Sequence, residues 1–201
     1  MILTHICRTI AIAGHAGDHA TVLGGLDHEA SEVRVVALGA AARLNILTPE
    51  ALDRFFDDPA TEVRYRAVEL VARNGNSVGS DLIGRLLAAL NDPNLAEVAA
   101  FTLGELSLSG QHLTRAEAAL GAQATDHEDP LSRESAVAAL GALGVGLPHI
   151  LKASHDVATV RRRAISALAP FDGAEVEATL QRALDDRDWQ VRQAAEDLLE
   201  E

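Results

Sequence analysis

Two His-Glu pairs in this chain are candidate ligands of a metal ion. His28-Glu29 stands in the stretch LDHEASEVRVVALGA, and His127-Glu128 stands much later in the similar stretch DHEDP. Imidazole nitrogens and carboxylate oxygens are common ligands of transition metals. The two pairs therefore raise the hypothesis of a metal centre, and the alternative is that each occupies the turn before a helix.

A second candidate pair is His15 and His19, which lie four positions apart with Asp18 between them. On one continuous helix both imidazoles would share a face and could bind zinc. Gly14 and Gly17 disfavour such a helix, and Asp18 is better placed as the N-cap of a helix over residues 20–26. We therefore predict no metal here, and we expect no catalytic residue and no cofactor elsewhere, because no single His has a visible partner for acid–base work.

The composition limits the partners of the chain. Acidic residues number 30 against 17 basic ones, which gives a formal net charge of −13, and such a field repels nucleic-acid backbones and anionic membranes. The single cysteine, Cys7, excludes an intrachain disulfide and a multi-cysteine zinc site. The start MILTHICRTIAIAG has no basic residue before its apolar run, so we expect no signal peptide and a cytoplasmic location.

A repeated pattern organises the chain: an apolar residue, an Arg, an Ala three positions after the Arg, and a second apolar pair. Offsets 0, +4, +7, +8 and +11 from the first apolar residue fall on one face of a helix. A sixth copy, Leu95-Ala96, keeps the apolar spacing but lacks the Arg. The five copies with Arg begin at Val33-Arg34, Val63-Arg64, Ser132-Arg133, Val160-Arg161 and Val191-Arg192.

An apolar segment precedes most of these helices, so we predict two helices per repeat and no strands. The junctions are rich in Asp and Pro, which are typical of turns and helix N-termini. The predicted first helices cover residues 49–56, 81–90, 115–122, 147–153 and 175–184.

The pattern Asp-Pro-x-x-x-Val-Arg, complete at Asp58 to Arg64, together with a following Ala-Leu-Gly, resembles the HEAT repeats of bacterial proteins, in particular the short type named from phycobilisome lyases. The resemblance covers roughly residues 15–200. It implies an all-α, right-handed α-solenoid of about six stacked helix-turn-helix repeats. Because this fold is mainly used for protein binding, it implies a scaffold rather than an enzyme.

In similar HEAT repeats an acidic residue of the inter-helix turn, six positions before the Arg, joins it in a ladder between neighbouring repeats. The slot six before the Arg holds Asp58 and Asp186 in two repeats and His28, His127 and His155 in three others. The resemblance therefore assigns the histidines to a structural slot. The implied ladder residues are Arg34, Asp58, Arg64, Arg133, Arg161, Asp186 and Arg192.

Two functions other than scaffolding follow from the resemblance. The deoxyhypusine hydroxylases are HEAT-repeat enzymes that hold two irons with four His-Glu pairs inside their helices. Here only two pairs occur, and both precede a helix. His28 and His127 lie three repeats apart, so stacking of about 10 Å per repeat would separate them by about 30 Å, which is too far for ligands of one metal site. The second alternative, an accessory or chaperone-type subunit of a bilin lyase, rests on the name of the repeat type alone.

We expect one repeat domain over residues 1–201, with an N-terminal cap helix over 1–14. The third repeat lacks the Arg, and Leu90 occupies the slot six before Ala96, so the ladder should be interrupted there. The longest spacing between repeats follows, with the run Ser107-Leu108-Ser109-Gly110. These features predict a hinge near residues 94–113.

The exposed side of the second helices is the surface on which we expect a protein or peptide partner. Arg161-Arg162-Arg163 is the main basic cluster, and with few aromatic residues it does not support a HEAT-like DNA glycosylase, so no nucleic acid is expected. Trp189 is expected to cover the end of the core. The predicted partner contacts are Tyr65, Arg66, Glu69, Glu97, Glu134 and Arg162. The oligomeric state is left open.

Overall fold

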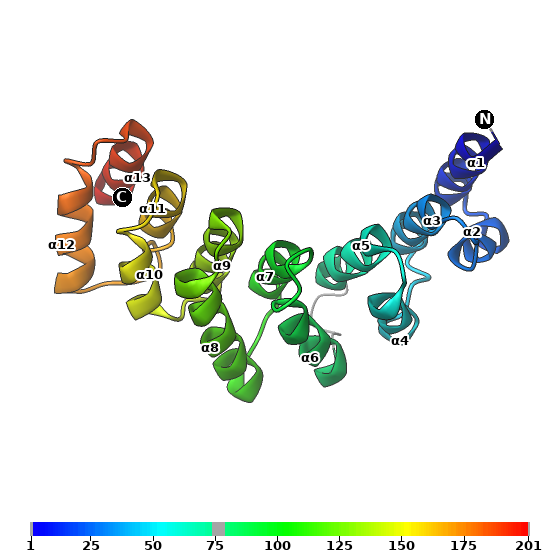
Figure 1. The fold of residues 1–201 in the computed structure, drawn as a ribbon, viewed down its shortest axis with the longest axis horizontal. Helices are drawn as coiled ribbons and strands as arrows, with labels where there is room; N and C mark the ends of the chain where they lie inside the picture. The colour runs from blue at the N-terminus through cyan, green and yellow to red at the C-terminus, as the bar shows by residue number, and fades with distance from the viewer. Residues whose placement is uncertain (1, 74–78, 201) are drawn as a thin grey trace. The chain divides into compact units, whose positions relative to one another are not determined.

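The computed structural model describes residues 2–73 and 79–200, which form thirteen α-helices and one 3-10 helix (Figure 1). No strand occurs in this described part of the chain. The elements are α1 (Ile2–Ala16), α2 (His19–Leu26), α3 (Ser31–Arg43), α4 (Pro49–Asp53), η1 (Arg54–Asp57), α5 (Thr61–Val71), α6 (Ser80–Ala89), α7 (Ala96–Gly104), α8 (Gly110–Asp126), α9 (Pro130–Leu143), α10 (Leu147–Ala153), α11 (Ala158–Ser166), α12 (Ala174–Ala183) and α13 (Trp189–Glu200).

Local sequence explains where several helices begin. Thr48 caps α4 by accepting a hydrogen bond from the Ala51 amide, and Pro49 follows as the first helical residue. Asp129 caps α9 in the same way and is followed by Pro130. Asp18 caps α2 through the Thr21 amide, which confirms its predicted role.

The chain divides into two compact units, residues 1–85 and 86–201, with the boundary inside α6. In the N-terminal unit α1, α3 and α5 pack side by side, while α2 packs on α3 and η1 packs on α5. The helices that carry the Arg, together with α1, thus form one layer, and the first helices of the pairs form another.

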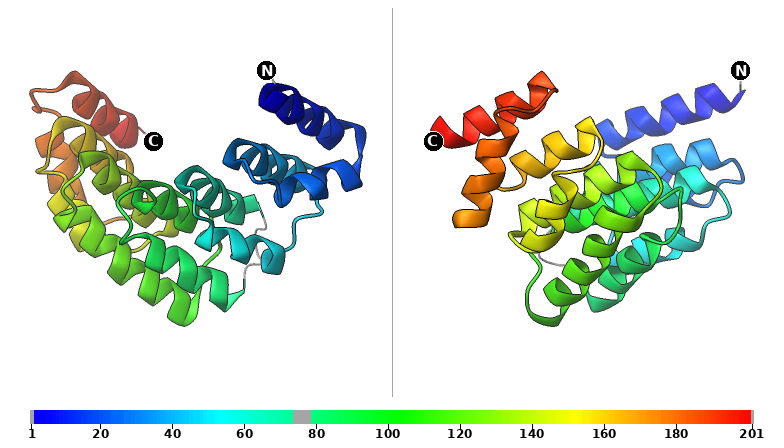
Figure 2. Two further views of the ribbon diagram at one scale, coloured as in Figure 1. Left: turned by 45° about the vertical axis from the view of Figure 1, so that its right-hand side comes forward. Right: turned by 60° about the vertical axis from the view of Figure 1, so that its left-hand side comes forward.

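The C-terminal unit repeats this plan. The second helices α7, α9, α11 and α13 contact one another in sequence order, and α8, α10 and α12 pack behind them (Figures 1 and 2). The apolar positions of the repeat are buried, as at Val160, Ala164 and Leu168 in the fifth pair. The predicted all-α helical repeat is therefore confirmed, and α8 is longer than expected because its helix begins already at Gly110.

Glycine at the end of the second helices lets their backbones approach closely. A Cβ added at Gly141 would lie 2.9 Å from the Ala167 Cα and 3.0 Å from the Ala167 carbonyl oxygen. A Cβ at Gly104 would likewise lie 2.9 Å from the Ala139 Cα. The glycine of the Ala-Leu-Gly pattern is thus a packing requirement between adjacent repeats.

The single-domain assignment and the hinge near residues 94–113 stay predictions, and amide hydrogen exchange can test the hinge. None of the described helices is both long and apolar enough to cross a membrane.

Candidate partner-binding surface

A ladder of arginine and aspartate connects neighbouring helix pairs. In the N-terminal unit the Arg34 Nε and Nη2 donate to the two carboxylate oxygens of Asp58 at 2.8 and 2.7 Å. The Arg34 Nη1 donates to the carbonyl oxygens of His28 and Glu29, each at 2.9 Å. One guanidinium therefore closes the turn of its own repeat and binds the turn of the next.

The C-terminal unit has two such connections. Arg133 binds Asp156 at 2.7 and 2.8 Å, and Arg161 binds Asp186 at 2.9 and 2.7 Å, in both cases through Nε and Nη2. The hydrogen bonds from these guanidinium groups hold the pKa values of Asp156 and Asp186 below the ordinary range, although burial opposes the shift. At the C-terminal end Arg192 closes its own turn by donating to the Asp186 carbonyl oxygen at 2.7 Å.

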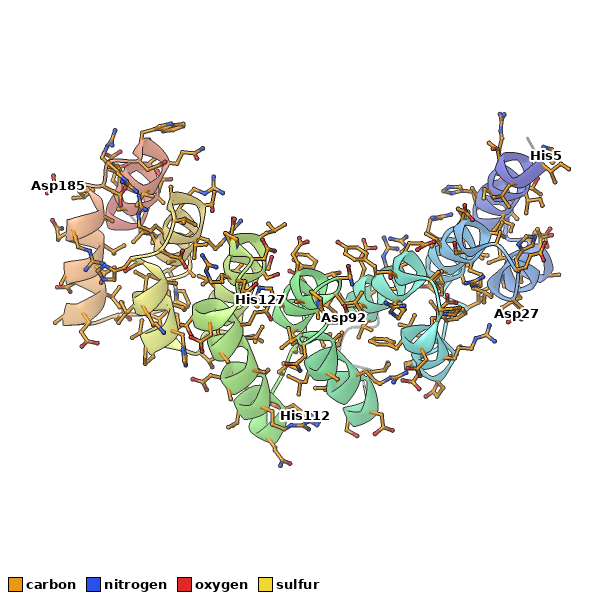
Figure 3. The ribbon with its side chains drawn as sticks, in the orientation of Figure 1. His5, Asp27, Asp92, His112, His127 and Asp185 are labelled. Atoms are coloured by element: carbon orange, nitrogen blue, oxygen red, sulfur yellow. The ribbon has the colours of Figure 1, made fainter. Side chains whose placement is uncertain are left out.

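The turn histidines make the hydrogen bond that aspartate makes in other repeats. The Nδ1 atoms of His28 and His127 accept from the amides of Ala30 and Asp129, each at 3.1 Å. In the matching position the Asp58 carboxylate accepts from the Ala60 amide at 2.9 Å. Either side chain can therefore stabilise this turn, and Figure 3 shows His127 between α8 and α9.

Only aspartate can in addition receive the arginine of the preceding repeat. His127 follows the pair in which Ala96 replaces the Arg. At this turn histidine therefore stands where the preceding described repeat has no arginine in the ladder position. His155 differs from the prediction, because its side chain is exposed and the adjacent Asp156 binds Arg133. In this repeat the slot residue Asp156 stands five positions before Arg161 rather than six, so the turn before α11 is one residue shorter.

A glutamine spans the repeats where the arginine is absent. Gln123 on α8 is 6% exposed, and its Nε2 donates to the carbonyl oxygens of Ala96 and Ser132, each at 3.1 Å. It thereby connects α7 to α9. Sequence reasoning missed this role, although a polar residue on the buried face of α8 was a usable signal.

The other metal candidates lie apart from each other. His15 belongs to α1 and His19 to α2, and Gly17 between them adopts a positive φ of 80°. Cys7 is half-buried in α1. Across residues 2–73 and 79–200 no group of three or more His, Cys, Asp or Glu side chains is placed to hold a metal ion.

The predicted partner contacts of the N-terminal unit lie on α5. Tyr65 is 39% exposed, whereas Arg66 and Glu69 form an ion pair at 2.5 Å. The Arg66 Nη2 also lies over Gly39 of α3, 2.7 Å from where a Cβ would stand. Arg66 therefore serves the contact between α3 and α5.

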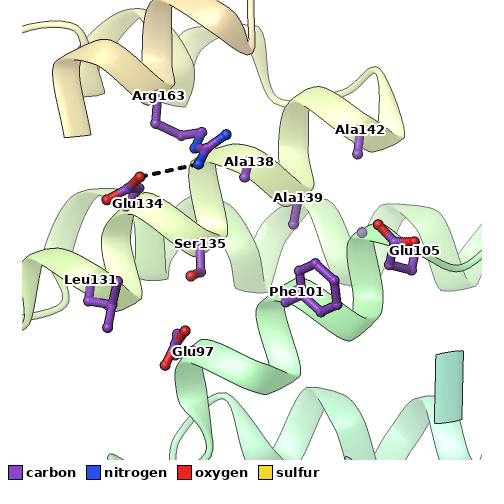
Figure 4. A pocket seen from close by; sticks show the side chains of 11 residues that line it. Glu97, Phe101, Glu105, Leu131, Glu134, Ser135, Ala138, Ala139, Ala142 and Arg163 are labelled. Atoms are coloured by element: carbon purple, nitrogen blue, oxygen red, sulfur yellow. Dashed lines mark hydrogen bonds and ion pairs between the residues drawn. The ribbon is translucent and has the colours of Figure 1, made fainter. Parts of the chain in front are cut away.

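Two of the predicted contacts of the C-terminal unit, Glu97 and Glu134, line a groove formed by α7, α9 and α11, whereas Arg162 lies outside its lining. The groove encloses about 410 Å³, and Glu97, Glu134 and Arg163 line it (Figure 4). Phe101 and Leu131 also line it and are 54% and 51% exposed. Two large apolar side chains therefore face solvent in the same concave surface.

The two walls of this groove differ in charge. The Glu134 carboxylate accepts from Arg162 and Arg163 at 3.4 and 3.3 Å, and Figure 4 marks the second contact. Glu97 and Glu105 have no ion pair or side-chain hydrogen bond within the described part of the chain. The α7 wall is therefore acidic, while Arg163 of the α11 wall shares the Glu134 carboxylate with Arg162.

Sequence reasoning missed Phe101, Leu131, Glu105 and Arg163 as groove residues. Phe101 occupies offset +6 from its anchor Leu95, a position filled by Gly39, Glu69, Ala138, Ser166 and Asp197 in the other repeats. A phenylalanine in a row of polar and small residues was the available signal.

A second hollow of about 330 Å³ lies between α11 and α13 and is lined by Arg162, Trp189 and Gln193 among others. Trp189 is 64% exposed, so the prediction that it covers the end of the core is wrong. Trp189 is the first residue of α13, and the buried positions of this helix are held by Val191 and Ala195.

No family model matches this chain, and no curated protein matches it. Among solved structures it is similar to YibA of Escherichia coli, with 15% identity, a TM-score of 0.67, and coverage of 90% of this chain and 69% of YibA. It is also aligned with human deoxyhypusine hydroxylase in complex with glycerol, with 20% identity, a TM-score of 0.49, and coverage of 97% of this chain and 78% of the hydroxylase. The likeness to YibA shows the fold alone, and the chain has a helical-repeat fold.

Proposed function

We propose that this chain is a non-enzymatic scaffold that binds another protein through the groove on the second helices of residues 86–201. The observation that carries the proposal is the exposure of Phe101 and Leu131 together in one concave surface. Large apolar side chains that share a hollow with a charged rim are typical of protein-binding sites.

The packing around the groove supports a preformed surface. The Arg133–Asp156 and Arg161–Asp186 contacts join consecutive helix pairs. Gln123 makes the corresponding connection one pair earlier, between α7 and α9. A surface that is already ordered loses less conformational entropy when a partner binds. The repeat signature supports the short bacterial HEAT type, and the single cysteine fits a reducing, cytoplasmic location.

The test is quantitative affinity capture with the wild-type chain and a Phe101→Ser/Leu131→Ser variant. The matched control is Val157→Ser/Leu199→Ser, which removes two apolar side chains that are 46% and 41% exposed but do not line the groove. Far-UV circular dichroism checks that all three proteins are folded.

We expect a set of proteins that the wild type and the control retain and the groove variant loses. Equal retention by all three proteins would contradict a binding role for this groove.

A further inference from the structure

We propose that the groove binds an extended, basic peptide segment of the partner, with one cationic side chain beside Glu97, another beside Glu105, and an apolar side chain on the Phe101 ring between them. This inference rests on the proposed function and adds the chemical class of the ligand. A basic protein segment fits this groove because the carboxylates of its α7 wall have no ion-pair partner among the described residues.

The three side chains lie in one row. Glu97, Phe101 and Glu105 are four residues apart from each other along α7 and its C-terminal cap, so each step is about 6 Å along the helix axis. Figure 4 shows the three side chains along the α7 wall of the groove. Two carboxylates therefore flank an exposed aromatic ring, about 12 Å apart.

The charge of the α7 wall selects a cation. Within the described residues Glu97 and Glu105 have no basic partner, whereas Glu134 across the groove already binds two arginines. A neutral segment would leave the carboxylates uncompensated, and an acidic one would be repelled from this wall.

The spacing of the carboxylates defines the spacing in the ligand. An extended chain advances about 3.3 Å per residue, so residues i and i+4 are about 13 Å apart and point to the same side together with residue i+2. The sequence Arg-x-Leu-x-Arg therefore matches Glu97, Phe101 and Glu105 in order. Arg163 on the opposite wall disfavours a basic ligand side chain there, which leaves the α7 wall as the place for it.

The experiment uses three fluorescein-labelled peptides in which the motif reads Arg-Ala-Leu-Ala-Arg, Gln-Ala-Leu-Ala-Gln or Glu-Ala-Leu-Ala-Glu. Binding to the full chain is measured by fluorescence anisotropy at about 0.05 M and about 0.3 M salt, because screening weakens exposed charge pairs. The groove variant is Glu97→Gln/Glu105→Gln. The control variant, Glu175→Gln/Glu177→Gln, removes the same charge from exposed positions at the start of α12.

We expect the Arg peptide to bind about tenfold more tightly than the Gln peptide at the lower salt concentration, since two exposed ion pairs together are worth about this factor. The groove variant should abolish the preference and the control variant should keep it. A Phe101→Ala variant should weaken the Arg and Gln peptides alike.

Absence of binding by the Arg peptide, a preference that survives in the groove variant, or tighter binding of the Glu peptide would each overturn the ligand class. The proposed function is tested separately by the capture experiment. If capture depends on Phe101 and Leu131 while the Arg peptide fails, the scaffold role stands and only the basic ligand is wrong.

Discussion

Replacing Asp156 by alanine removes one connection between helix pairs, and the neighbouring His155 provides a matched control. Asp156 accepts two hydrogen bonds from Arg133 and one from the Val157 amide. His155 is exposed. The sequence pattern favoured His155 as the slot residue, whereas the structure places the connection at Asp156, so the two substitutions separate the two interpretations.

The burial of the pair determines the size of the effect. The Arg133 and Asp156 side chains are 14% and 20% exposed, so the pair lies between a surface ion pair, worth about 0–1 kcal/mol, and a fully buried one, whose disruption costs about 3–5 kcal/mol. Arg133 keeps the carbonyl oxygens of His127 and Glu128 as acceptors after the substitution. We therefore expect Asp156→Ala to lower the free energy of unfolding by about 2–3 kcal/mol.

Urea denaturation followed by far-UV circular dichroism at pH 7 measures this loss. A loss of about 2–3 kcal/mol corresponds to a decrease of about 4–12 °C in the thermal midpoint for a chain of this length. His155→Ala should change the free energy of unfolding by less than about 0.5 kcal/mol. The slope of unfolding against urea must stay constant for the comparison to hold.

The pH dependence adds a second readout. The folded-state pKa of Asp156 is lowered from 3.8, first by its hydrogen bonds with Arg133, so its stabilisation is fully present above that value. It is lost as the pH falls through the lower folded-state pKa, and the difference between wild type and Asp156→Ala should shrink in that acidic range. Equal losses for Asp156→Ala and His155→Ala, or a difference between wild type and Asp156→Ala that is unchanged in strong acid, would show that Asp156 does not connect the two helix pairs.

Two further substitutions test the packing between repeats. Gly141→Ala should destabilise the chain by about 1–3 kcal/mol, because the added Cβ would lie 2.9 Å from the Ala167 backbone. Its control, Gly84→Ala, should stabilise the chain by up to about 1 kcal/mol, because nothing lies within 4 Å of the added Cβ and alanine favours a helix. Gln123→Leu should cost about 1–3 kcal/mol in urea denaturation by removing the two buried hydrogen bonds that join α7 and α9, while Gln193→Leu on the exposed face should stay within about 0.5 kcal/mol. If a test substitution and its control changed the free energy of unfolding equally, the corresponding contact, at Gly141 or at Gln123, would not determine the stability of the array.

Much of the fold was predictable because its signals are local. Apolar residues at helical spacing place each helix from residues within a few turns of each other, and Asp18 or Pro130 marks a helix start without any distant partner. The repeat then shows which faces are buried, since each pair must cover the apolar stripe of the next. The absence of the Arg at Ala96 was equally visible in the sequence.

The helices, their pairing and the repeat can therefore be inferred from the amino-acid sequence. The binding of Arg133 by Asp156 and the connection that Gln123 makes between α7 and α9 cannot, because these contacts join residues 23 to 27 positions apart whose meeting depends on the turns between them. The exposure of Phe101 and the neutralisation of Glu134 by two arginines likewise arise only in the folded chain. The exposure of a side chain depends on what its neighbours leave uncovered, so the unusual residue type of Phe101 in its repeat is a signal but does not decide its exposure.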